Sequence, residues 1–445
     1  MNICQGVQLH VLETTKFKDV GFYFRFIQPL RRETATVYSL LALMMSDRLE
    51  IYPTKQKMSQ RLDELYGMSI GAQTIGYGQA QVLELRAKMI HPRFAEDESL
   101  LDEGIHFLKE MILRPLLSED SLKEAKRILL SKLKRMRDDA SQYVVHQGLK
   151  YAGKDHALAI SALGEEEILQ KTTLEEIKEA HRALLEESGI DVIVCGDLDR
   201  KHTIDAIVGC FEWKPRIKDI ESYYAIDSTD SPEIIQETRS IPQTSLMQVY
   251  FTHTDVKDPK YYALRVMNAM LGQYSTSLLF QNVREKNSLC YSIYSNLIAF
   301  DGAMGITTGI EKKDIDQVLT LIQEQIETLK NGTFDEELLT VARSPLTDIF
   351  ASPATLSVVV PAAITSNCID IDSFEPYADA SRSANDTTPL LPAPTGFIIE
   401  LSYDTGTEAA SITSDADIIT VTVIVLPTVP LAELIDIEAC SSALA

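Results

Sequence analysis

The sequence has eight histidines among its 445 residues, and no two of them lie three to five residues apart. A helical zinc site needs two histidines on one face of a helix, so the sequence provides no such pair. The six cysteines are also far apart and form no C-x-x-C pair, which predicts reduced, buried thiols rather than a disulfide framework. No G-x-S-x-G motif is present, which argues against a serine hydrolase.

Long apolar runs are absent as well. No run reaches the roughly 20 residues that a membrane-spanning helix needs, and the N-terminus lacks a basic stretch followed by an apolar one. Together with the reduced thiols, these absences predict a cytoplasmic protein. The formal net charge of −23 argues against nucleic acid as a partner, because a polyanion would be repelled.

The charge is unevenly distributed along the chain. Residues 1–344 carry 41 basic and 51 acidic residues, whereas residues 345–445 carry one basic residue, Arg382, and 14 acidic ones. Lysine and histidine are absent from the second range, which has the composition of a foreign segment, a frameshifted end or a different module. We expect Pro345 to interrupt a helix, and residues 418–426 (IITVTVIVL) to form a strand.

A repeated pattern indicates duplication. An amphipathic helix over 98–113, an acidic N-terminal turn and a long helix recur about 215 residues later, starting at 314. The pattern predicts an α+β fold of two duplicated domains, each an antiparallel sheet packed against helices. The predicted boundaries are an N-terminal domain, a proline-punctuated linker, a C-terminal domain and an acidic tail of unknown fold (1–212, 213–244, 245–344 and 345–445).

One segment, LLFQNVREKNSLCYS at 278–292, carries Arg284 and Tyr291 seven residues apart. Together with RLDELYG at 61–67 and LKEMILRPLLSEDSLKEAKRILLSKLKRMRDD at 108–139, it resembles the insulinase-type (pitrilysin-type, inverzincin) zinc peptidases. The resemblance covers about residues 1–344. It is to the small bacterial members, which are akin to mitochondrial processing peptidase.

Catalytic members of that family hold zinc with an H-x-x-E-H helix and a later glutamate. Aligned on Tyr52 and the proline after it, the three motif positions fall on Ser39, Ala42 and Leu43, and the later glutamate falls at or near Lys132. None of these side chains replaces a zinc ligand, and an ammonium group repels the metal. The resemblance therefore implies that this chain holds no metal, and that zinc belongs to a partner subunit.

The resemblance also implies a role for Arg284 and Tyr291. In the family, the matching residues reach the substrate backbone and stabilise the charged tetrahedral intermediate, which suits a guanidinium and a phenol hydroxyl. The alternative is structural: Arg284 pairs with a carboxylate such as Glu285 or Asp301, and Tyr291 belongs to the core.

The implied function is that of a non-catalytic, zinc-less subunit in a heterodimeric metallopeptidase. It would supply substrate-binding residues to a zinc-bearing homologue that processes peptides or unfolded polypeptide. Paired members of this type are associated with the maturation of modified elongation factor P. The alternative is a scaffold or interaction protein that keeps the peptidase fold without any proteolytic role. A peptidase active on its own requires a metal site that the sequence does not provide.

Overall fold

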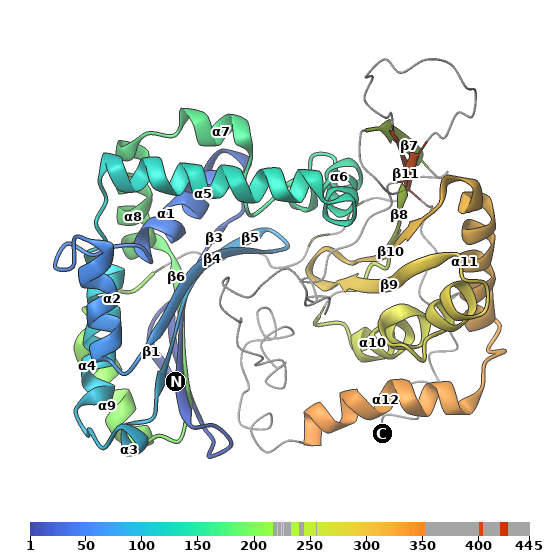
Figure 1. Cartoon of the computed structure of the whole chain (residues 1–445). Coiled ribbons are helices and arrows are strands. Elements are labelled where there is room, and N and C mark those ends of the chain that lie inside the picture. Colours follow the sequence, from blue (N-terminus) through green and yellow to red (C-terminus); the bar gives the residue numbers. More distant parts are fainter. Residues whose placement is uncertain are drawn as a thin grey trace. The chain divides into compact units, whose positions relative to one another are not determined.

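The computed structural model describes residues 1–216, 220, 224, 226, 233–239, 244–254, 256–351, 400–403 and 419–425. The chain divides into two compact units, each made of two stretches of sequence (Figure 1). The first unit comprises Met1–Met136 and Ile160–Ser222, and the second comprises Arg137–Ala159 and Tyr223–Ala445. Among the described residues, no helix is both long and apolar enough to cross a bilayer.

The first unit is a six-stranded sheet in the order β1-β2-β6-β3-β5-β4. Strand β6 runs parallel to β2, and the other neighbours are antiparallel. Its strands are β1 (Asn2–Cys4), β2 (Val7–Glu13), β3 (Asp19–Pro29), β4 (Ser69–Tyr77), β5 (Ala80–Ile90) and β6 (Gly189–Gly196). Its helices are α1 (Arg32–Met45), α2 (Lys55–Glu64), α3 (Pro92–Ala95), α4 (Leu100–Leu113), α5 (Glu119–Asp138), α7 (Glu166–Lys171), α8 (Leu174–Glu187) and α9 (Arg200–Cys210).

Alternation along β3 builds the core of this unit. Phe22, Phe24 and Phe26 point to the same face of the sheet and are each at most 1 % exposed. They join a cluster with apolar residues of α1, including Leu40 and Leu41, which are fully buried. Burying a side chain of this size contributes about 1.5–3 kcal/mol, so the helices gather on this face of the sheet (Figure 1).

The second unit is also a six-stranded sheet, in the order β11-β7-β12-β8-β10-β9. Its strands are β7 (Glu233–Thr238), β8 (Thr244–Phe251), β9 (Cys290–Ile298), β10 (Ala303–Ile310), β11 (Glu400–Tyr403) and β12 (Ile419–Val425). Its α-helices are α6 (Ala140–Gly153), α10 (Tyr261–Asn268), α11 (Ile315–Lys330) and α12 (Glu336–Ala351). Two π-helices, η2 (Ala269–Gln273) and η3 (Phe280–Glu285), and the 3₁₀ turns η1 (Ala157–Ala159), η4 (Ala299–Asp301) and η5 (Lys312–Asp314) complete it.

The two sheets confirm the predicted α+β class with a duplicated domain. The order β2-β6-β3-β5-β4 in the first unit matches β7-β12-β8-β10-β9 in the second. One strand breaks the match, because β6 runs antiparallel to β3 whereas β12 runs parallel to β8. Strand β6 also pairs with β3 over seven residues, but β12 pairs with β8 over only two. The predicted strand at 418–426 therefore exists. It occupies the place in the second sheet that β6 occupies in the first, but it runs in the opposite direction.

Helix α6 is where the structure departs from the predicted domain boundaries. Residues 137–159 were placed in the N-terminal domain, but they group with the second unit. Two α6 tyrosines hold β7, because Tyr143 and Tyr151 donate hydrogen bonds to Glu237 over 2.6 and 2.8 Å. Glu237 lies inside the predicted linker at 213–244, so part of that linker is a strand rather than a connection.

The expectation that Pro345 interrupts its helix is also wrong. Helix α12 continues from Glu336 through Pro345 to Ala351. A proline removes one backbone donor, and a helix can continue past it where neighbouring elements hold its backbone. Here α12 packs against α10 and η2 and buries Ala342, which is 2 % exposed, in the core of the second unit.

A buried acid in the second unit makes its stability depend on pH. Asp301 is 8 % exposed and accepts a hydrogen bond from Tyr224 Oη over 2.5 Å, while Leu158 N donates to Tyr224 Oη over 2.6 Å. Burial raises the pKa of Asp301 to about 6, although the hydrogen bond from Tyr224 opposes the shift. The protonated acid is therefore the form that the fold favours.

We expect the free energy of unfolding to fall as pH rises through 6. The stabilisation from protonated Asp301 is fully present below the ordinary aspartate pKa of 3.8 and is lost above about 6. A shift of this size corresponds to about 3 kcal/mol. Asp301→Asn removes this component, and urea unfolding at pH 5 and pH 7.5 will measure about half of it. The exposed Asp316 provides the control, and an equal pH slope in Asp301→Asn and Asp316→Asn would contradict the assignment.

Candidate substrate-contacting site

Arg284 and Tyr291 lie side by side in the second unit. Arg284 is in η3 and Tyr291 is in β9, and the guanidinium carbon lies 5.7 Å from the centre of the Tyr291 ring. The same carbon lies 4.4 Å from the ring of Phe280, one turn earlier in η3. A cation held over an aromatic face at this distance is attracted by about 0.5–1 kcal/mol at an exposed site. Two aromatic rings therefore orient the guanidinium.

The segment that carries Arg284 is fixed by its neighbours. Val283 is fully buried, and Asn282 Nδ2 donates to Gln325 Oε1 of α11 over 2.7 Å. Gly272 in η2 lets the chain pass close to β9, because a Cβ atom there would lie 2.8 Å from the backbone nitrogen of Ser295. Single π-helical turns recur at functional sites. Here two of them, η2 and η3, follow each other along the chain with a short connection between them, and both precede β9.

The surface of this site is open. Tyr291 is 78 % exposed, which contradicts the alternative that it belongs to the core. Arg284 Nε lies 3.7 Å from Glu285 Oε1, a long and partly exposed ion pair, whereas Asp301 is bonded to Tyr224 instead. Exposed pairs of this kind contribute about 0–1 kcal/mol. The Glu285 carboxylate therefore leaves the guanidinium able to bind another anion.

The chemistry available here is hydrogen-bond donation rather than nucleophilic attack. A guanidinium and a phenol hydroxyl both donate to a carbonyl oxygen or to the oxyanion that forms from it. Burial raises the pKa of the neighbouring Cys290 thiol, although Thr308 and Arg284 act in the opposite direction, so this thiol ionises less readily than a free one. The chemistry of this pair is therefore suited to donating hydrogen bonds to a peptide group.

The positions that the sequence predicts for the missing zinc motif lie on α1 in the first unit. Ser39 is 3 % and Ala42 is 1 % exposed, and Leu43 is partly buried against the core. Ser39 Oγ lies 2.6 Å from Thr74 Oγ1 and donates to the carbonyl oxygen of Ala162 over 2.9 Å. The hydroxyl of Ser39 is therefore hydrogen-bonded within the protein, and it is not available as a metal ligand.

Lys132 lies on α5, exposed to solvent. Burial of part of its side chain lowers the pKa of Lys132, and the nearby Arg135 lowers it further. No hydrogen bond or ion pair connects it to α1 within the described part of the chain. A serine, an alanine, a leucine and a lysine supply no anionic or imidazole ligand, so the residues present do not fit zinc. In the described ranges, no three histidine, cysteine, aspartate or glutamate side chains form a group that could hold a metal ion.

Sequence reasoning missed two parts of this architecture. Phe280 orients Arg284, and its spacing of four residues on a helical segment was the available signal. Gln81 also donates to the carbonyl oxygen of Ala162, over 2.8 Å. No sequence signal identifies that contact, because the acceptor is a backbone atom 81 residues away.

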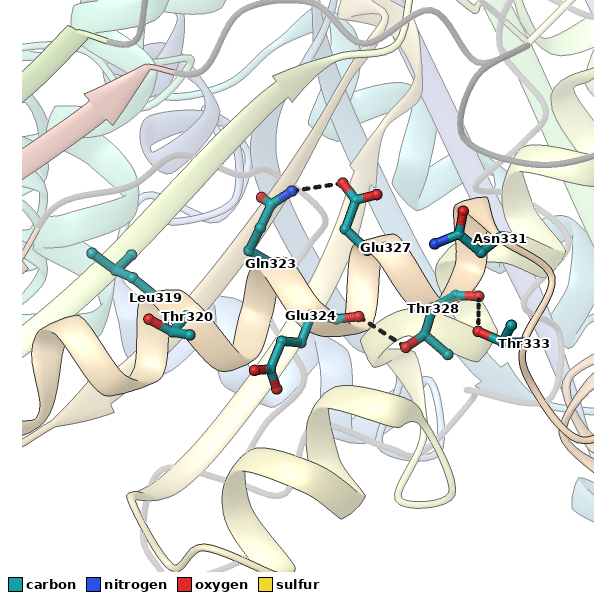
Figure 2. A pocket seen from close by; sticks show the side chains of 8 residues that line it. All are labelled: Leu319, Thr320, Gln323, Glu324, Glu327, Thr328, Asn331 and Thr333. Carbon is teal, nitrogen blue, oxygen red and sulfur yellow. Dashed lines mark hydrogen bonds between the residues drawn. The ribbon is translucent and has the colours of Figure 1, made fainter.

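A separate open pocket follows one side of α11 (Figure 2). Gln323 Nε2 donates to Glu327 Oε1 over 2.9 Å, and Thr328 Oγ1 donates to the backbone oxygen of Glu324 over 2.8 Å. Two of the polar side chains that line the pocket, Gln323 and Thr328, are thus bonded to neighbours on the same helix. Its lining residues are Leu319, Thr320, Gln323, Glu324, Glu327, Thr328, Asn331 and Thr333.

A duplicated α+β fold with an Arg–Tyr pair, and with no group of zinc ligands among the described residues, is typical of one class of protein: the inactive insulinase-type homologues. The comparisons with known proteins agree. The profile of the family "Peptidase M16 inactive domain" matches residues 171–346. The chain is 30% identical over 339 residues to "Probable inactive metalloprotease YmfF" of Bacillus subtilis, covering 75% of this chain and 79% of that protein. The chain therefore belongs to the M16 peptidase family.

Other relatives and solved structures are consistent with this assignment. The "Non-peptidase homolog YmxG" of Helicobacter pylori is 25% identical over 281 residues, which is 59% of this chain and 63% of that protein. The crystal structure of a conserved protein from Enterococcus faecalis matches with a TM-score of 0.70 and 27% identity, over 80% of this chain and 87% of that one. A peptidase M16 inactive domain from Pseudomonas fluorescens matches in fold, with a TM-score of 0.61 and 20% identity over 79% and 84% of the two chains.

Proposed function

We propose that this chain is the zinc-less subunit of a heterodimeric M16 metallopeptidase of the cytoplasm. Arg284 and Tyr291 bind the substrate backbone, and a homologous partner subunit supplies the zinc. The substrate class is a peptide or an unfolded segment of polypeptide. The observation that carries the proposal is the exposed Tyr291 beside a guanidinium that two rings orient.

The energetics support a role in binding. A tyrosine that is 78 % exposed contributes little apolar burial to folding. The ion pair between the guanidinium and Glu285 is long, at 3.7 Å, so a substrate oxygen can displace it at small cost. Donors that are already oriented need little reorganisation when a charged intermediate forms, which is why such groups stabilise transition states well.

The second role is that of a scaffold without proteolysis. The hydrogen-bonded hydroxyl of Ser39 and the buried side chain of Ala42 favour it. These two positions, which are expected to hold zinc ligands in catalytic relatives, are here part of the packed interior of the first unit. The two roles differ in one observable: whether this chain increases peptide cleavage by a zinc-bearing M16 subunit.

The test uses the full chain, a zinc-bearing M16 homologue and their mixture. We expect the chain alone to bind no stoichiometric zinc by atomic absorption and to cleave no fluorogenic peptide. The mixture should cleave the peptide much faster than the homologue alone, because both halves of the site are then present. Formation of a complex without any gain in cleavage would favour the scaffold role, and stoichiometric zinc in the isolated chain would overturn both.

A further inference from the structure

The solvent side of α5 is strongly basic although the chain as a whole is acidic. Between residues 122 and 137 the helix has seven basic residues and one acidic residue, Glu124. The opposite side is apolar: Leu122, Ala125, Leu129 and Leu133 are at most 7 % exposed and pack into the core of the first unit. The basic residues are Lys123, Lys126, Arg127, Lys132, Lys134, Arg135 and Arg137.

Three of these residues share one line along the helix, which we call the α5 stripe: Lys123, Arg127 and Lys134. They are spaced four and seven residues apart, which places them on one face of a helix with 3.6 residues per turn. All three are exposed. Their spacing of 11 residues corresponds to about 17 Å along the helix axis.

The stripe is poorly neutralised by the protein itself. Lys123 and Lys134 take part in no ion pair within the described part of the chain. Arg127 has Glu124 at 3.9 Å, but that carboxylate is already held by Lys55 over 2.5 Å. Other exposed cations are paired more closely, as Arg182 is with Glu186 over 2.7 Å.

Positive charge also gathers on the flank of the stripe. Lys132 and Arg135 follow each other at the helical spacing of three residues, and Arg135 adds to the effect of burial in lowering the pKa of Lys132. Like charges left together on a surface cost free energy, and a bound anion removes that cost. Binding of an anionic ligand at these cations is therefore favoured over leaving them exposed to solvent.

We propose that the α5 stripe binds an acidic, extended segment of polypeptide. About five residues of an extended chain span 17 Å at about 3.3 Å per residue, so a short run of glutamate or aspartate matches the stripe in length and sign. A long polyanion such as nucleic acid fits less well, because the remaining surface of a chain with net charge −23 repels it. The proposal does not depend on Arg284 or on a zinc-bearing partner.

The experiment measures binding of a fluorescein-labelled hexaglutamate peptide to the full chain by fluorescence anisotropy. The stripe variant is Lys123→Glu with Lys134→Glu, and the matched control is Lys171→Glu with Lys178→Glu, two exposed lysines that are already paired with Glu167 and Glu175. We expect the stripe variant to bind about tenfold more weakly, because two attractive contacts become repulsive. The control should change by less than about twofold, and binding should weaken as salt is added.

Three outcomes would overturn the proposal. The first is equal binding of hexaglutamate by the stripe variant and the control, and the second is no binding by the unmodified chain at low salt. The third is tighter binding of a short single-stranded oligonucleotide or of phosphatidylserine vesicles than of the peptide. Circular dichroism of both variants establishes that they are folded, so a loss of binding is assigned to the charge.

Discussion

Arg284→Ala, mixed with a zinc-bearing M16 subunit, is expected to lower peptide cleavage about 10²–10³-fold without dissociating the pair, because this is the effect of removing one preorganised oxyanion donor. The guanidinium lies 4.4 Å from the Phe280 ring and 5.7 Å from the Tyr291 ring, so it is oriented before substrate arrives. The measurement is the rate of cleavage of a fluorogenic peptide at saturating subunit ratio. Size-exclusion chromatography reports whether the pair persists.

Lys286→Ala is the matched control for this variant. Lys286 is exposed, lies two residues from Arg284 and donates to Asn282 Oδ1 over 2.8 Å, so its loss removes a neighbouring cation without touching the rings. We expect cleavage in this variant to stay within about twofold of the unmodified pair, since exposed charges have weak effects at a distance. Equal and full activity in Arg284→Ala and Lys286→Ala would remove Arg284 from the proposed role.

The fold was largely predictable because its main signals are local. An apolar run identified the strand at 418–426, and the recurrence of helix, acidic turn and helix identified the duplication. Both signals depend on residues close in sequence, where periodicity reflects which face is buried. Contacts between segments far apart in the sequence leave no such local pattern, so the sequence did not predict them.

The errors in the fold lie where distant residues decide the outcome. The assignment of α6 depends on Tyr143 and Tyr151 bonding to Glu237, more than 80 residues away. The continuation of α12 past Pro345 depends on packing against α10 and η2, which outweighs the lost backbone donor. The direction of β12 could not be predicted, because the same apolar pattern forms a strand whichever way the chain runs, and only its pairing with neighbouring strands sets the direction.

The sequence predicted which residues belong to the candidate site, but not how they are arranged in space. The sequence named Arg284 and Tyr291 and, as the positions expected for zinc ligands in catalytic relatives, Ser39, Ala42, Leu43 and Lys132. It did not show that Tyr291 is exposed, nor that Phe280 completes the support of the guanidinium. Such facts depend on how η3 meets β9, which a single sequence does not encode in any short pattern.

The second large effect concerns Gly164, which holds the chain against α1 in the first unit. Its φ angle is +93°, and a Cβ atom there would lie 2.5 Å from the backbone Cα atom of Thr36. Thr36 Oγ1 also accepts a hydrogen bond from Glu165 N over 2.9 Å, so the two segments cannot separate freely. A backbone atom cannot rotate away, and the only relief is to move the segment that also provides the Ala162 carbonyl oxygen to Ser39.

We expect Gly164→Ala to lower the free energy of unfolding by about 3–5 kcal/mol, which combines backbone strain with a clash in a packed interior. Urea unfolding followed by circular dichroism measures it. Gly67→Ala separates the two causes, because Gly67 has a similar positive φ of +73° but open space around it. That control should lose only about 1–2 kcal/mol from strain. If both variants lose the same amount, the close approach to Thr36 contributes nothing. A larger loss in Gly164→Ala would show that the close packing of this segment against Thr36 of α1 adds to the stability of the first unit beyond the backbone strain.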